Sequence, residues 1–170
     1  MECIDEAAVS ENRWYVAHTK SRAEKKLQQY CVREGLEVSL PCVTSVRKYQ
    51  SKTARFDLPL FPGYLFVRVN PLHKTVVAQS SHCARLLEVP DQHAFVRQLA
   101  DIEAAVSSEL EVCLAPQIVD GVRVVIKSGP LRGIEGVVEK RTGIVDVLLR
   151  LDFIGQAAVV RIHVSELEAL

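Results

Sequence analysis

Short runs of β-branched residues, separated by closely spaced glycines, fill the last part of the chain and leave few folds open to it. Val and Ile dominate the segments 122–126, 134–138, 144–151 and 157–164. Such residues favour strands over helices. Turn formers cluster in Gly129-Pro130-Leu131-Arg132-Gly133-Ile134-Glu135-Gly136. Four or five short strands within about fifty residues predict a small β-barrel.

The glycines of this segment have a structural interpretation. Gly and Pro permit the tight reversals and bulges that a strongly curved sheet needs. A phosphate-binding loop would need a helix after its glycines, whereas a strand is expected here. The residues predicted to shape the barrel are Gly121, Gly129, Pro130, Gly133 and Gly136.

Strand and helix patterns alternate over residues 13–107. Strands are expected over 14–18, 37–41 and 83–89 and after Phe61, with a long, mobile hairpin over 43–58. Helices are expected over 21–34, from Asn70 through 77, and over 91–107. Ser21-Arg22-Ala23-Glu24 fits a capping box, and Gly35 supplies a stop. The short connections indicate an antiparallel sheet flanked by helices.

Changes of composition suggest the domain organisation. Residues 1–12 are acidic and read as a flexible tail. Residues 108–119 contain Ala115-Pro116-Gln117 without periodicity and are interpreted as a linker. It would join a domain over 13–107 to the barrel over 120–170.

Composition excludes several classes of protein. The chain has 170 residues, of which 48% are hydrophobic and 25% charged, as in globular proteins. Its apolar runs are too short to span a membrane, and its start does not resemble a signal peptide, so the cytoplasm is expected. Five cysteines without a Cys-x-x-Cys pair argue against a disulfide framework and a zinc site. Neither a metal nor a cofactor is expected.

The net charge of zero hides an uneven distribution. Residues 13–57 carry ten Lys and Arg against four Asp and Glu, a net charge of +6, while residues 88–120 have a net charge of −6. A basic segment favours phosphate backbones as partners. A solvated surface is the alternative interpretation.

A Pro-Gly corner gathers aromatic residues in the middle of the chain. Leu60-Phe61-Pro62-Gly63-Tyr64-Leu65-Phe66-Val67 holds three of the ten aromatic residues. Proline cannot donate to a sheet ladder, so this corner should start a strand. Its rings either fill the core or present a docking face to a partner.

Two motifs resemble a known family. Gly121-Val122-Arg123-Val124, Gly129-Pro130-Leu131, Gly133 and Gly136-Val137-Val138 resemble the KOW motif. Trp14-Tyr15-Val16 and Leu60-Phe61-Pro62-Gly63-Tyr64 resemble the amino-terminal domain of bacterial NusG transcription factors. The resemblance implies an α+β fold, with a NusG amino-terminal-type antiparallel sheet flanked by helices and an SH3-like KOW barrel. Pro59 to Val67 and His18-Thr19-Lys20 are most similar to the specialised, RfaH-like antiterminators.

The resemblance implies a factor without catalytic activity that binds the clamp helices of RNA polymerase and keeps the polymerase elongating. It also implies a specialised paralogue that acts on selected operons. It would associate with the nucleoid through the polymerase. The residues implied in polymerase binding are Trp14, His18, Phe61, Pro62, Tyr64 and Phe66.

Further partners are implied for both domains. Lys20 and Arg33 match positions that contact the non-template DNA strand in RfaH-like relatives, and Arg22, Lys25 and Lys26 lie on the same basic segment. The family's barrel recruits a small-subunit ribosomal protein or a termination factor. That surface maps near Phe153 and Ile154, which fit a barrel core equally well. Relatives also contact the opposite polymerase jaw through a His-Thr-Thr triplet, where this chain has Thr75-Val76-Val77.

Three alternatives remain open from the sequence. One is a general NusG-type factor, and another is a ribosome- or RNA-associated KOW protein, which would not need the aromatic corner. The third is a small Cys/His hydrolase, since the chain has five histidines and five cysteines. Neither a nucleophile elbow nor metal-ligand spacing supports this enzyme.

Overall fold

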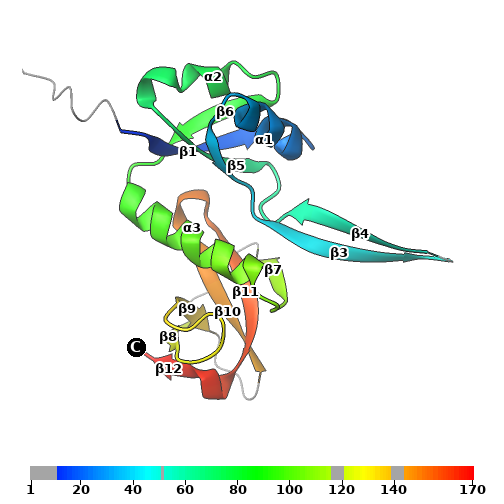
Figure 1. The fold of residues 1–170 in the computed structure, drawn as a ribbon. Coiled ribbons are helices and arrows are strands. Elements are labelled where there is room, and N and C mark those ends of the chain that lie inside the picture. Colours follow the sequence, from blue (N-terminus) through cyan, green and yellow to red (C-terminus); the bar gives the residue numbers. More distant parts are fainter. Residues whose placement is uncertain (1–10, 51, 116–120, 139–143) are drawn as a thin grey trace, which may run out of the picture. The chain divides into compact units, whose positions relative to one another are not determined.

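The computed structural model describes residues 11–50, 52–115, 121–138 and 144–170 (Figure 1). The chain divides into two compact units. Unit 1 consists of Met1–Leu40 and Phe61–Gln92, and unit 2 consists of Pro41–Leu60 and His93–Leu170. The predicted tail over 1–12 lies almost wholly outside the described residues, as does the linker from 116 onward.

Unit 1 is a four-stranded antiparallel sheet with the strand order β2-β5-β1-β6. The strands are β1 (Arg13–Thr19), β2 (Glu37–Ser39), β5 (Tyr64–Val69) and β6 (Cys83–Glu88). Between them lie helix α1 (Glu24–Arg33), the 3-10 turn η1 (Pro71–His73) and the short helix α2 (Thr75–Ala78). The strands expected from the sequence are confirmed.

One face of this sheet forms a core with the helices. Alternate residues of β1 and β5 meet apolar side chains of α1 and α2 in a buried cluster that includes Tyr15, Ala17, Leu27, Cys31, Leu65, Val67 and Val77. The helix ends where it was expected to end. Gly35 has φ +72, and its N–H donates to Val32 while Leu36 donates to Cys31, the two bonds of a Schellman motif.

Two local predictions in unit 1 are wrong. The predicted capping box does not form, because Ala23 is the N-cap of α1 without a side-chain bond, and the Glu24 carboxylate binds a residue far along the chain. The single helix expected after Asn70 is a 3-10 turn followed by one helical turn. Asn70 does cap this segment, by accepting from the Leu72 N–H. The β-branched residues 75–77 have low helix propensity and support only that single turn.

Unit 2 contains a hairpin, a helix and a six-stranded sheet. The hairpin consists of β3 (Cys42–Tyr49) and β4 (Lys52–Pro59), as expected. Helix α3 (Gln92–Ser107) buries Phe95, Leu99, Ile102 and Ala105 along one stripe. Val106, which was expected on this stripe, is half-buried.

The six-stranded sheet is antiparallel throughout and has the order β12-β8-β9-β10-β11-β7. It is formed by β7 (Val112–Ala115), β8 (Val122–Ile126), β9 (Glu135–Val138), β10 (Ile144–Leu151), β11 (Gln156–His163) and β12 (Leu167–Ala169). The 3-10 turns η2 (Asp152–Ile154) and η3 (Val164–Glu166) lie between the last strands. This is the expected barrel-like, KOW-type region. Strand β7 lies within the segment interpreted as a linker and pairs with β11.

Two glycines of this region have the conformation that the turn requires. Gly129 and Gly133 have φ +81 and +88, and the Gly133 N–H closes the reversal by donating to Ile126 at 2.7 Å. Gly136 is needed for close packing, because a Cβ there would lie 2.5 Å from Cγ1 of Val147. The structural role expected for these glycines fits this geometry.

Candidate functional site

The corner before β5 is held through both backbone polar groups of one glycine. Gly63 has φ +85, which favours glycine. Its N–H donates to Oε1 of Glu24 at 2.7 Å, and its carbonyl oxygen accepts from the Thr19 N–H at 2.8 Å. A Cβ on Gly63 would lie 3.7 Å from the His18 ring. The corner is therefore attached both to the end of β1 and to the start of α1.

Strand pairing brings several predicted site residues to one face of the unit 1 sheet. Directly opposed residues of antiparallel strands share a face, and every second residue along a strand returns to it. The opposed pairs are Trp14 with Arg68, Val16 with Phe66, and His18 with Tyr64. This face is opposite the one that packs against α1 and α2.

The aromatic residues of the corner differ in exposure. Phe61 and Phe66 are 1% and 0% exposed, and their rings meet edge to face with centroids 6.1 Å apart. Tyr64 is half-buried beside the exposed His18, with ring centroids 5.4 Å apart. The outer strand face therefore shows Tyr64 but not the two phenylalanines. Their contact with a polymerase stays a prediction that requires them to be uncovered.

Two further residues of the predicted set lie on either side of this pair. Pro62 is exposed at the corner, and Trp14 is half-buried near the other end of β1. The backbone of Trp14 is bonded at both polar groups to the side-chain amide of Gln92, at 2.8 Å each. We define the exposed His18 and Pro62 together with the half-buried Tyr64 as the corner platform.

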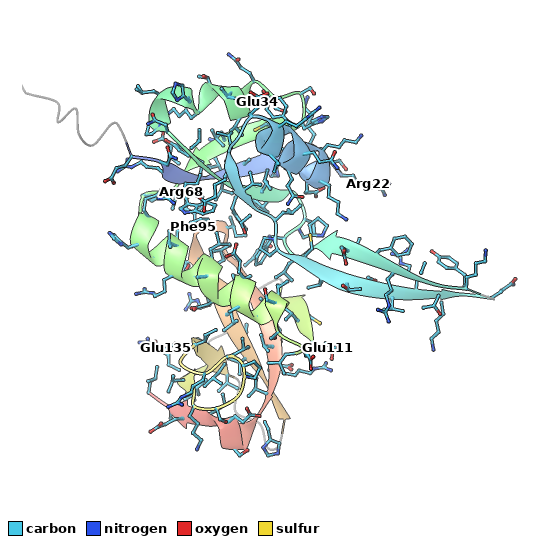
Figure 2. All side chains as sticks on the ribbon, in the orientation of Figure 1. Arg22, Glu34, Arg68, Phe95, Glu111 and Glu135 are labelled. Atoms are coloured by element: carbon cyan, nitrogen blue, oxygen red, sulfur yellow. The ribbon has the colours of Figure 1, made fainter. Side chains whose placement is uncertain are left out.

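The predicted nucleic-acid residues form a separate basic surface at α1. Lys20 and Arg22 lie in the turn before the helix, and Figure 2 labels Arg22 there; Lys26 and Arg33 lie two turns apart on one side of α1. All four are exposed, as is Lys25. None forms an ion pair with another residue that the structure describes. Their charges are thus available to an anionic partner.

The predicted partner edge of the barrel lies against α3. Phe153 and Ile154 are half-buried in η2, and the Phe153 ring stands edge to face with Phe95 of α3, with centroids 6.4 Å apart. Asp152 accepts from the Gln98 side chain at 2.8 Å and donates its backbone N–H to the same side chain at 3.1 Å. A partner at this edge would compete with α3.

A polar cleft of about 510 Å³ lies between α3 and the barrel. Its charged lining is largely paired: Arg123 with Glu135 at 2.9 Å, and Arg150 with Asp152 at 3.0 Å. Burial is the main cause that raises the pKa of the Asp101 carboxyl. The positive charge of Arg97 lowers this pKa, and the negative charge of Glu135 raises it. These are the contacts of a polar interface, and they bring no nucleophile and base together.

The two buried thiol groups, those of Cys31 and Cys83, do not have the properties of catalytic nucleophiles. Burial is the main cause that raises the pKa of Cys31 to about 11, and it also raises the pKa of Cys83. A reactive cysteine needs a lowered pKa and access to solvent. Within the described ranges, no three His, Cys, Asp or Glu side chains gather as a possible metal site. Among the same residues, no helix is both long and apolar enough to cross a membrane.

Comparison with known proteins decides the family. Residues 12–110 match the family model of NusG, described as transcription termination factor nusG. The chain belongs to the NusG family. Members of this family are transcription factors, not enzymes. A solved structure of NusG from Thermotoga maritima covers 95% of this chain and 99% of its own, with 24% identity and a TM-score of 0.53. The MjSpt4:Spt5 complex covers 92% of this chain and 96% of its own, with 16% identity and a TM-score of 0.31.

The contribution of Glu24 was missed by sequence reasoning. Its position three residues after Ser21 is typical of a capping box, yet the carboxylate binds Gly63, 39 residues away. No local pattern contains that pairing. The NusG fold provides it by placing the start of α1 beside the corner.

Proposed function

We propose that this NusG-family factor binds the clamp helices of RNA polymerase through the corner platform and thereby increases the processivity of transcription. The observation that carries this proposal is the exposed His18 ring beside the half-buried Tyr64 ring and the exposed Pro62, on a backbone held at Gly63 by two hydrogen bonds. An aromatic pair on a fixed backbone loses little conformational freedom on binding, and such residues dominate interface energetics. Trp14 would extend the same surface along β1.

The buried phenylalanines contribute in one of two ways. Phe61 and Phe66 either support the corner as a buried pair beside the platform, or they join the contact when the surface is uncovered. The variant Phe61→Ala is a poor test of binding, because removing a buried Phe costs about 3–5 kcal/mol of stability. Tyr64 is the better residue to test.

The test measures binding of the full chain to core RNA polymerase. Tyr64→Ala should weaken binding by about thirtyfold, the equivalent of the 2 kcal/mol typical of an interface anchor. The matched control is Tyr49→Ala, which removes a 56% exposed tyrosine of the hairpin and should leave binding unchanged. A folded Tyr64→Ala protein with wild-type affinity would remove the corner platform from the interface.

The exposed basic residues at α1 support a second contact of the same factor. We propose that Lys20, Arg22, Lys26 and Arg33 bind phosphates of the non-template strand during elongation. Such binding weakens as salt rises, because it releases counterions. Salt-independent association with that strand would argue against this assignment.

A specialised role is supported by Pro59 to Val67 and His18-Thr19-Lys20, which resemble RfaH-like factors. We propose action on selected operons, with the barrel recruiting a ribosomal protein or a termination factor through Phe153 and Ile154. Because Phe153 packs against Phe95, that recruitment requires the edge to leave α3. Mapping the factor along transcripts in cells tests the specialisation, and uniform occupancy of all transcripts would identify a general factor instead.

A further inference from the structure

The β3–β4 hairpin is a ribbon only two strands wide. The two strands pair in register from Cys42 with Pro59 to Tyr49 with Lys52. Neither strand joins another sheet among the residues that the structure describes. Figure 1 shows them running side by side over their whole length. Eight residues per strand span about 27 Å at about 3.4 Å per residue.

Positive charge is concentrated in the half of the ribbon farthest from Cys42 and Pro59. Residues 47–55 contain four cations and no acidic residue. All four are exposed, and none forms an ion pair within the described part of the chain. The one acidic residue of the two strands, Asp57, accepts from the Thr44 hydroxyl in the other half. We call Arg47, Lys48, Lys52 and Arg55 the hairpin cations.

The hairpin cations are spaced regularly along the ribbon. The last four pairs are Val46 with Arg55, Arg47 with Ala54, Lys48 with Thr53, and Tyr49 with Lys52, so each pair contains one cation. Successive pairs lie about 3.4 Å apart. One DNA strand presents one phosphate per about 3.4 Å of helix axis. Along its axis, the ribbon thus carries one positive charge in about the length over which one DNA strand carries one phosphate.

The hairpin cations also alternate between the two faces of the ribbon. Opposed residues share a face, and successive residues of a strand alternate. Arg47 and Lys52 therefore lie on one face, and Lys48 and Arg55 lie on the other. A single strand following one face would meet only half of these charges. A ribbon inserted in a duplex groove has a phosphate backbone on each side, and the major groove is wide enough for a two-stranded ribbon.

We propose that the hairpin binds double-stranded DNA in the major groove, with Arg47 and Lys52 contacting one phosphate backbone and Lys48 and Arg55 the other. This contact is independent of the polymerase and of the basic surface at α1. The binding is electrostatic and does not depend on base sequence.

The test measures binding of the full chain to a labelled 24-base-pair duplex by fluorescence anisotropy at 50 to 200 mM salt, without polymerase. Each phosphate contact adds about 0.9 to the slope of log affinity against log salt. Replacing all four hairpin cations with Gln should make the slope about 3.6 less steep. Between 50 and 200 mM salt, the affinity of the wild-type protein should therefore fall about 150-fold more than the affinity of this variant. The α1 residues are unchanged in this variant, so their contribution cancels from the comparison.

Two double variants test the two-faced arrangement. Arg47→Gln with Lys52→Gln, and Lys48→Gln with Arg55→Gln, should each reduce the slope by about 1.8. If only one of these doubles weakens binding to the duplex, or if the fourfold Gln variant loses as much affinity for a single strand of the duplex as for the duplex itself, groove binding is wrong.

A matched control removes the same number of charges elsewhere. It replaces four exposed cations of other strands and turns with Gln: Arg13, Arg85, Lys127 and Arg132. This variant should keep the wild-type slope. An equal loss in the control would show that net charge, rather than the hairpin, determines the affinity.

Discussion

Removal of the Glu24 carboxylate should loosen the corner while leaving α1 in place. The Gly63 N–H donates to Glu24 at 2.7 Å in a partly buried position. A hydrogen bond to a charged group contributes about 1.5–3 kcal/mol, and the lower end applies where solvent reaches the pair. In Glu24→Ala, the free energy that protects this amide should therefore fall by about 1.5 kcal/mol, which is about tenfold in exchange rate.

The assay is amide hydrogen exchange followed by NMR at individual residues. Gly63 should exchange about tenfold faster in Glu24→Ala, whereas Leu27, whose N–H donates to Ala23 inside the helix, should keep its rate. Glu24→Gln retains an oxygen that can accept the bond and loses the favourable charge at the helix N-terminus. It should therefore accelerate Gly63 less than the Ala variant does.

A control and one outcome decide the interpretation. Glu34→Ala removes the same side chain from the other end of α1, where it is exposed, and should change neither amide. Equal acceleration of Gly63 and Leu27 in Glu24→Ala would mean that the helix has frayed. Unchanged protection of Gly63 would refute the claim that Glu24 holds the corner.

Two further predictions concern unit 2. Gly136→Ala should destabilise the barrel by about 1–3 kcal/mol in urea unfolding, because the added Cβ would meet Val147 at 2.5 Å; an unchanged midpoint would contradict this. The pKa of Asp101 is raised by burial from its ordinary value of 3.8. Between the ordinary and the raised pKa, the folded state binds more protons than the unfolded state, so stability falls as pH rises through that window. Asp101→Asn should abolish this fall and raise the free energy of unfolding at pH 7; a less stable variant would mean that the carboxylate's attraction to Arg97 outweighs its burial.

Strands were predicted well because their signal is local. Strand β10 has the bounds expected from its β-branched run, Ile144–Leu151, and the expected hairpin forms by pairing the adjacent strands β3 and β4. Strand β7 was missed because its four residues lack alternation. It becomes a strand only by pairing with residues more than 40 positions later. Such pairing depends on the tertiary fold.

The candidate site, too, could be predicted only as far as local sequence patterns reach. The sequence predicts which residues share a sheet face, because strand periodicity is two, but it does not predict which of them the fold covers. Tyr64 and Phe66 are two positions apart on one face, yet one is half-buried and the other fully buried. The hydrogen bond between Glu24 and Gly63 was not predicted for a different reason. The position of Glu24 fitted a local capping box, and this interpretation left no reason to look for a distant partner.

The buried and exposed aromatic residues of the corner have separate physical roles. Phe61 and Phe66 meet edge to face in a buried pair, which fixes the chain on both sides of Gly63, the bend before it and strand β5 after it. Glu24 and Thr19 fix Gly63 itself. His18 and Tyr64 then project from a backbone with little freedom left, so a partner would pay only a small entropic cost to bind them. On this reasoning, loosening the corner through Glu24→Ala should weaken polymerase binding without removing any contacting atom, and Glu24→Gln should restore part of the affinity.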